Sequence, residues 1–151
     1  MTADKLEDET DNPEESVKPV FWIGSSLEDI RDFPDDVRLS MGFALWEAQQ
    51  GRKHIDAKSL KGFGGAGVLE VVADEQGSTF RGLYTVKFTG AVYVLHVFQK
   101  KSKRGAKTPK HEMDLIHKRL RAAADHHKDW RSAQKKEKQN EKSKTDKGKK
   151  K

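Results

Sequence analysis

The 151-residue sequence contains no cysteine, which excludes disulfide bonds, thiolate metal ligands and a cysteine nucleophile. It has no run of about 20 apolar residues, the length that a membrane-spanning helix needs. The first residues are acidic and lack the basic and then apolar pattern of a secretory signal. From these absences we expect a cytoplasmic protein whose chemistry does not use thiols.

Apolar residues are scarce at both ends of the chain. Hydrophobic residues make up 34% of the sequence and charged residues 36%. Residues 1–16 carry seven acids and one lysine, and residues 132–151 carry nine lysines and three acids. Segments of this kind bury too little apolar surface to offset the entropy lost on ordering. The composition predicts an acidic disordered arm over 1–16, one folded domain over 17–131 and a Lys-rich disordered tail over 132–151.

Charge is divided unevenly along the sequence, although the whole chain has a formal net charge of +6. From residue 100 onward there are 20 Lys and Arg against 7 Asp and Glu, whereas residues 1–99 hold 10 and 17. A C-terminal part with this excess of cations predicts a polyanionic partner.

Hydrophobic patterning predicts an α+β fold with the order β-α-α-β-β-β-α. A β-branched and aromatic stretch at 17–24 suggests a first strand, and a helical hairpin follows up to Gly51. Ser25 and Glu28 have the spacing of a capping box at the start of the first helix. One face of the second helix is expected to be apolar, with Val37, Met41, Ala44, Leu45 and Ala48.

Three strand candidates follow at 68–73, 79–88 and 91–99, and their short connections predict antiparallel hairpins. The last of these strands is apolar on both sides, as is typical of a central strand. Thr108 and Pro109 begin a final helix, whose apolar stripe is expected to comprise Met113, Ile116, Leu120 and Ala124. The expected architecture is a small antiparallel-rich sheet with its helices packed on one face.

Nucleotide and metal sites find little support in the sequence. Gly62, Gly64 and Gly67 match G-x-G-x-x-G, but that motif follows a strand and opens a helix in a nucleotide-binding unit, whereas here it precedes a strand. Four histidines fall on the final helix with no H-E-x-x-H motif, so a solvated face is expected for them: His111, His117, His126 and His127. We predict neither a metal site nor a cofactor.

Basic residues converge at one end of the predicted sheet. In the strand at 79–88, Arg81 and Lys87 share one face with Leu83 and Thr85, and the aromatic side chains occupy the other. The aromatic face is expected to be core, so the Arg81 face is expected to be open. A hairpin about Thr89 and Gly90 places Arg81 opposite residues 97–99, next to Lys100 and Lys101.

A cluster of fixed cations without metal ligands suits phosphate chemistry on RNA. The 2′-hydroxyl of RNA can attack the adjacent phosphorus, and Arg and Lys donors can stabilise the charge that develops on the phosphoryl oxygens. A lysine crowded by like charges has a lowered pKa, which suits it to proton transfer. The structural alternative for Arg81 is an ion pair with Glu70 on the neighbouring strand, and the sequence leaves both open.

Three stretches carry a family resemblance: "LKGFGGAGVLEVV", "FRGLYTVKF" and "AVYVLHVFQKKSKRGAKTPKHEMDLIHKRL". They resemble the phage-related branch of the RelE/HigB toxins of bacterial toxin–antitoxin systems, a likeness that covers residues 19–125. The most specific part runs from the last strand into the final helix, F-Q-K-K-x-x-K-x-x-x-T-P. The resemblance implies a compact RelE-like sheet-and-helix fold and cleavage of messenger RNA, in most relatives at the ribosome.

The resemblance also implies roles for individual residues. Arg81 matches the strand arginine that contacts the scissile phosphate, and Lys100 and Lys101 match the basic pair that ends the last strand. Six further cations are expected to bind RNA: Lys58, Lys61, Lys87, Lys103, Arg104 and Lys107.

Two departures from the family pattern leave the general base open. Val72 stands where many relatives have a basic residue, and no tyrosine follows Tyr93. Lys61, Lys101 and His54 are the candidates for the base.

We therefore expect the toxin of a type II toxin–antitoxin pair, a metal-independent endoribonuclease that inhibits translation. Its expected partners are messenger RNA, the ribosome and a cognate antitoxin with a helix-turn-helix domain. Two alternatives remain at this stage. One is a non-enzymatic poison of DNA gyrase like the ParE proteins, which share the fold, and the other is a phage-derived nucleic-acid-binding module.

Overall fold

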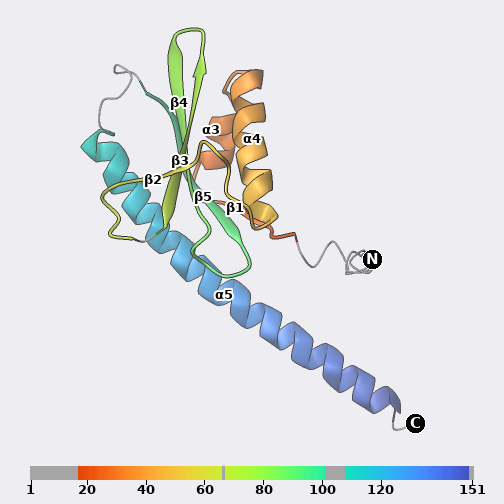
Figure 1. Ribbon diagram of the computed structural model, residues 1–151. Helices are drawn as coiled ribbons and strands as arrows, with labels where there is room; N and C mark the ends of the chain where they lie inside the picture. The colour runs from red at the N-terminus through yellow and green to blue at the C-terminus, as the bar shows by residue number, and fades with distance from the viewer. Residues whose placement is uncertain (1–16, 66, 101–107, 150–151) are drawn as a thin grey trace, which may run out of the picture.

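The computed structural model describes residues 17–65, 67–100 and 108–149 (Figure 1). It contains one five-stranded sheet in the order β1-β5-β4-β3-β2. The strands are β1 (Val20–Trp22), β2 (Lys58–Ser59), β3 (Val68–Glu75), β4 (Ser78–Thr85) and β5 (Val92–Lys100), and the helices are α3 (Ser26–Arg31), α4 (Asp35–Gln49) and α5 (Lys110–Lys149). The predicted α+β class and element order are confirmed, with the two-residue β2 added at one edge.

Strand pairing follows the predicted hairpins. β3 pairs with β4 and β4 with β5, all antiparallel, whereas β1 runs parallel to β5. The β3–β4 turn has Gln76 and Gly77 at φ 49° and 82°, the two positive values of a type I′ turn, which matches the twist of a hairpin. In the next hairpin Arg81 lies opposite Phe98, inside the predicted range, and a bulge follows between Leu83 and Tyr84.

One core lies between the sheet and α4. All five residues predicted for the apolar face of this helix are buried, and they pack on side chains such as Val71, Phe80 and Tyr84. Gly82 lets the helix approach the sheet closely, because a Cβ atom at this position would lie 3.1 Å from Met41 Sδ.

A second core lies on the opposite face of the sheet, beneath α5. Ile116 and Ala123 of this helix are fully buried, together with Leu83, Tyr93 and Leu95 of the sheet. Figure 1 shows α3 and α4 on one side of the strands and α5 crossing the other. The expectation that all helices share one face is therefore wrong. The physical reason is β5, whose apolar side chains point to both faces and need cover on both.

The same arrangement corrects two finer expectations. The Arg81 face of β4 is not open, since Leu83 and Thr85 beside it are buried. On α5 the buried alanine is Ala123, while Ala124 is exposed, because a 3.6-residue period carries the stripe from Leu120 to the third residue along.

The predicted capping box is also absent. Ser25 makes no side-chain cap at the start of α3, and its Oγ instead donates a hydrogen bond of 2.8 Å to Asp29 Oδ2. Asp29 lies one helical turn along, so it meets the serine hydroxyl.

The last helix continues through the segment predicted to be a disordered tail. α5 reaches Lys149 and extends well past the sheet in Figure 1. Its last residue packed on the core is Trp130, and residues 135–142 are exposed on every side. The structure differs from the expectation here because Lys, Glu and Gln are good helix formers, so a helix begun by core packing can continue without it. No helix in the described part of the chain is long and apolar enough to span a membrane.

The two-sided burial of β5 makes a stability prediction with a matched control. Leu95→Ala removes a fully buried side chain and should lower the free energy of unfolding by about 2–5 kcal/mol. Leu39→Ala removes the same atoms from an exposed position of α4 and should change it by less than about 0.5 kcal/mol. Urea denaturation of both variants measures the difference, and equal losses would contradict the burial of β5 beneath α5.

Candidate functional site

The candidate site lies where β3 and β5 end and β4 begins, on the sheet face that α5 partly covers. Cross-strand pairing puts Val72 opposite Arg81 and Asp74 opposite Thr79, and Thr79 also pairs with Lys100 on the other side. Opposite residues of antiparallel strands project from the same face, so these side chains share one surface.

Arg81 is held by an ion pair with Glu70. The Arg81 Nη1 atom donates to Glu70 Oε2, and the side chains are only 11% and 13% exposed. The structural pairing considered from the sequence is therefore present. It does not use the whole guanidinium, because Arg81 Nε is buried and has no hydrogen-bond partner among the described residues. A buried donor left without a partner costs about 1–3 kcal/mol, so this arginine keeps a donor that an incoming oxygen could satisfy.

Lys100 lies beside this pair and is 4% exposed. Burial lowers the pKa of its ammonium group, the positive charge of Arg81 lowers it further, and Glu70 opposes the change. A lysine whose pKa is lowered releases its proton more readily, which suits a proton donor. Of the three residues expected to converge, Arg81 and Lys100 do so, while Lys101 lies outside the described residues.

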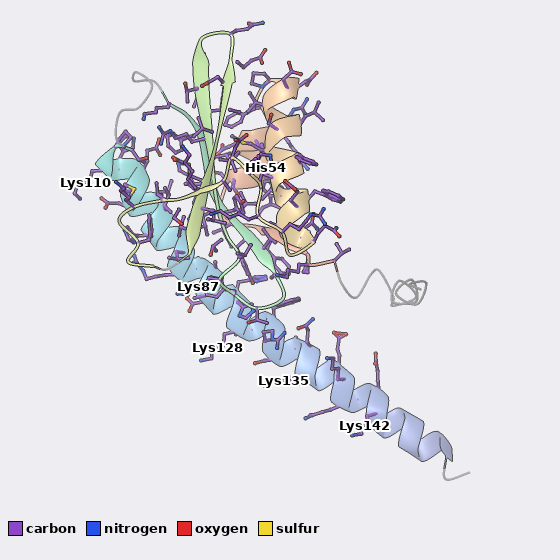
Figure 2. The ribbon with its side chains drawn as sticks, viewed as in Figure 1. His54, Lys87, Lys110, Lys128, Lys135 and Lys142 are labelled. Carbon is purple, nitrogen blue, oxygen red and sulfur yellow. The ribbon has the colours of Figure 1, made fainter. Side chains whose placement is uncertain are left out.

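The other predicted cations lie at different distances from Arg81. Lys58 of β2 pairs with Glu70 and is exposed, so it borders the same surface. Lys61 is exposed in the loop after β2. Lys87 lies six residues along the chain from Arg81, about 20 Å in a strand, at the far end of the sheet with its Nζ 5.6 Å from the Phe88 ring (Figure 2). Lys103, Arg104 and Lys107 fall outside the described residues.

The candidates for a general base change with the structure. His54 packs against α4, where its ring meets Phe43 and its Nε2 lies 4.0 Å from Glu47 Oε1, so it is on the opposite face from Arg81. Glu70 is the carboxylate in contact with Arg81, and sequence reasoning treated it only as a structural partner. Its position opposite Leu83, two residues from Arg81, could have been derived from the hairpin register.

A buried polar network supports the β5 end of the site. His96 precedes Phe98 and Lys100 on the same face of β5, and its ring stacks on Phe98 at 5.0 Å. His96 Nε2 lies 2.7 Å from Glu112 Oε1, and its Nδ1 lies 3.3 Å from Arg119 Nη1. Arginine can only donate, so Nδ1 accepts and Nε2 carries the proton given to Glu112.

The same arginine links three elements of the fold. Arg119 of α5 donates to the Leu95 carbonyl oxygen at 3.1 Å and to Ser25 Oγ at 3.1 Å. Burial lowers the pKa of His96 below its usual value, although the hydrogen bond to Glu112 opposes this change. Protonation would add an N–H at Nδ1 facing the Arg119 guanidinium, which is a second reason for the imidazole to stay neutral.

Three of the helix histidines contact the sheet or the loops beside it. His126 Nδ1 lies 2.7 Å from the Tyr93 hydroxyl, His127 Nε2 donates to the Thr89 carbonyl oxygen at 2.8 Å, and His117 stacks on Phe63. The expected solvated face is wrong for His117 and His127, which are partly buried, whereas His111 and His126 are exposed as expected, His126 with a bond to the sheet. α5 lies across the sheet, so positions that look polar in sequence meet aromatic side chains. Across the described ranges no three His, Asp or Glu side chains are grouped to hold a metal ion.

A comparison with protein-family models matches residues 28–121 to the family described as Phage derived protein Gp49-like (DUF891). The match covers more than half of the chain. This protein belongs to the Gp49-like family. The family lies within the RelE/HigB toxin-like group, and the matched range includes Glu70, Arg81, Lys100 and the His96 network. Searches of curated proteins and of solved structures gave no match.

The neutral His96 makes the stability of this Gp49-like protein depend on pH. A histidine whose pKa is lowered by folding stabilises the native state fully above its unfolded pKa of about 6.5, and that contribution is lost as the pH falls below this value. The free energy of unfolding should therefore fall between about pH 7 and pH 5 more steeply in the parent than in His96→Gln, which keeps a donor toward Glu112. The free energies are measured by chemical denaturation at each pH. If the parent and His96→Gln give parallel curves against pH, then the pKa of His96 is the same in the folded and unfolded protein and the prediction is wrong.

Proposed function

We propose that this protein is a metal-independent endoribonuclease, the toxin of a type II toxin–antitoxin pair, which cleaves messenger RNA and so inhibits translation. The observation that carries the proposal is the juxtaposition of Arg81, Glu70 and Lys100 on one largely buried surface. Membership of the Gp49-like family, which lies within the RelE/HigB toxin-like group, adds support. The surface combines an acceptor of protons, a donor of protons and a guanidinium for phosphate, which are the three functions that this reaction needs.

In the proposed reaction the Glu70 carboxylate accepts the proton of a ribose 2′-hydroxyl. The 2′-oxygen forms a bond to the adjacent phosphorus, and the bond from phosphorus to the 5′-oxygen of the next nucleotide breaks. The products are a 2′,3′-cyclic phosphate and a free 5′-hydroxyl, so no water or metal enters the balance. Arg81 stabilises the negative charge on the non-bridging oxygens, with Nε as a donor not already committed to Glu70.

Lys100 is assigned the transfer of a proton to the departing 5′-oxygen. Its position beside Arg81 and its lowered pKa favour the loss of the ammonium proton at the moment when charge develops on the leaving group. The way in for RNA is the β3 side of the surface, where Val72 is 40% exposed and Asp74 is exposed. Lys58 borders the same opening and would contact a flanking phosphate.

The proposed partners follow from the same assignment. Ribosome-bound messenger RNA is the proposed substrate, and a cognate antitoxin with a helix-turn-helix domain is the proposed inhibitor. Lys61 and Lys87, with the cations at 101–107, are proposed to bind RNA outside the reacting phosphate.

The proton-donor role of Lys100 can be separated from its effect on folding when melting and cleavage are measured on the same variant. Lys100→Met keeps the length and the apolar stem of the side chain, so the variant should still fold, and its melting temperature reports what the lost contacts of the ammonium group contribute. Cleavage should nevertheless fall by about 10²-fold or more, because the leaving group loses its acid. The measurements are thermal melting, growth arrest on induction without antitoxin, and primer extension on messenger RNA to detect new 5′ ends.

One double variant and a control complete this test. Glu70→Gln combined with Arg81→Met removes the ion pair without leaving one charge unpaired, and it should abolish the new 5′ ends. Lys128→Met changes an exposed lysine of α5 and should cleave normally (Figure 2). If folded Lys100→Met and the double variant arrest growth as strongly as the parent, the nuclease assignment fails.

The exposed end of α5 should add affinity without specificity. Lysines in this segment can neutralise phosphates, and affinity for RNA or ribosomes should fall by about 10³-fold between 50 and 200 mM salt if about six contacts form. Deleting residues 132–151 should reduce that salt slope and leave both the melting temperature and the cleavage positions unchanged, because residues 135–142 contact no core. Cleavage at new positions would show instead that this segment selects the site.

A further inference from the structure

A separate groove lies at the C-terminal end of α4, on the sheet face opposite the Arg81 surface. Its volume is about 310 Å³, at the lower end of the range for small-molecule sites. Its apolar side is formed by Leu69, Tyr84 and Val86, which lie near the start of β3 and the end of β4. Arg81 and Lys100 lie at the other end of these strands, so the two sites are separate.

Three cations line this groove. Lys18 comes from the segment before β1, and Arg52 and Lys53 follow α4. The segments are fixed to each other, since Lys18 N donates to the Gln49 carbonyl oxygen at 3.1 Å and Gln49 Nε2 donates to the Lys18 carbonyl oxygen at 2.7 Å. Arg52 is also fixed, with its guanidinium carbon 5.0 Å from the Trp46 ring centroid and its Nε 3.9 Å from Glu47 Oε2. One carboxylate beside three cations leaves a net positive charge here.

One residue of the groove wall, Tyr84, has a buried hydroxyl with no partner among the described residues. Tyr84 is 3% exposed, and its hydroxyl oxygen makes no hydrogen bond to any described residue. Burial, aided by the charge of Glu47, raises the pKa of Tyr84 to about 12, so the hydroxyl keeps its proton and can donate. Buried polar groups in native proteins are nearly always hydrogen-bonded, so an unpartnered one beside a groove calls for a ligand or an ordered water.

The geometry points to a nucleoside phosphate as the ligand of this groove. Its phosphate would lie among Lys18, Arg52 and Lys53, and its base would lie against Leu69 and Val86 with a hydrogen bond from Tyr84. Phosphate fits because three cations from two segments line the groove together with apolar side chains, and the volume suits one nucleotide. The ligand could be a free nucleotide or one residue of a single-stranded RNA.

The proposal goes beyond the endoribonuclease function and does not depend on it, because the groove shares no residue with the Arg81 surface. It can therefore be tested with Lys100→Met as the background and with RNA that cannot be cleaved. A 2′-O-methyl oligoribonucleotide has no free 2′-hydroxyl to attack the phosphate, so binding is measured without reaction.

The test is a nuclear magnetic resonance titration of the full chain with adenosine 5′-monophosphate, adenosine and the 2′-O-methyl oligonucleotide. The monophosphate should shift the backbone amides of Gly51 and Gly67 and the Trp46 indole N–H, and adenosine should bind at least about tenfold more weakly. If the oligonucleotide binds more tightly than the monophosphate, the natural ligand is an RNA strand. If the two bind equally, the natural ligand is a free nucleotide.

Three variants separate this site from general attraction of anions. Lys53→Glu should weaken binding of the monophosphate by about tenfold or more, while Lys128→Glu, a charge reversal on α5, should not. Tyr84→Phe should melt at the same or a higher temperature and bind about tenfold more weakly, as expected if the hydroxyl bonds to the ligand.

The proposal is overturned if the monophosphate shifts no groove resonance or if the two lysine reversals weaken binding equally. It is also overturned if a peptide with the acidic sequence of residues 1–16 shifts these resonances and the monophosphate does not. In that case the groove binds a protein segment.

Discussion

Burial of β5 on both faces is the constraint from which the rest of the architecture follows. Residues 91–98 are buried, so one apolar side must be covered by α4 and the other by α5. β5 also pairs with both β1 and β4, which fixes the register that brings Arg81 next to Phe98 and Lys100. The candidate site is therefore attached to a strand that is packed on both faces, where small displacements of reacting groups are resisted.

The polar groups of the site are held by a second layer of contacts. Glu70 contacts one edge of the Arg81 guanidinium. Arg119 of α5 bonds to Leu95 and His96 of β5, and to Ser25 just before α3, so it ties the strand that carries Lys100 to both helices. Buried charges need such partners, because the free energy lost when a charge is removed from water must be offset by hydrogen bonds and opposite charges around it. Arg81, whose Nε has no partner among the described residues, departs from this rule, and departures of this kind concentrate at functional sites.

Much of the architecture could be predicted from local pattern. The α4 face, the hairpins and the approach of Arg81 to residue 98 follow from periodicity and turn length, which act over a few residues. The placement of α5 could not be derived in this way, because nothing local to Ile116 says which face of the sheet it covers. For the same reason the contact of His126 with Tyr93 was missed, since it depends on that helix. The hairpin register predicts that Glu70 lies near Arg81. It does not say whether this contact only stabilises the fold or also takes part in a reaction.

The part of α5 beyond Trp130 carries positive charge far from the sheet. Nineteen residues from 131 to 149 in a helix span about 28 Å. That length is more than three times the Debye length of about 8 Å at physiological salt. The positive charge at the far end is thus screened from the acidic carboxylates of the domain, and it presents its own field to the surroundings. For the RNA partner proposed above, this extension would give the domain a larger target radius than its own size.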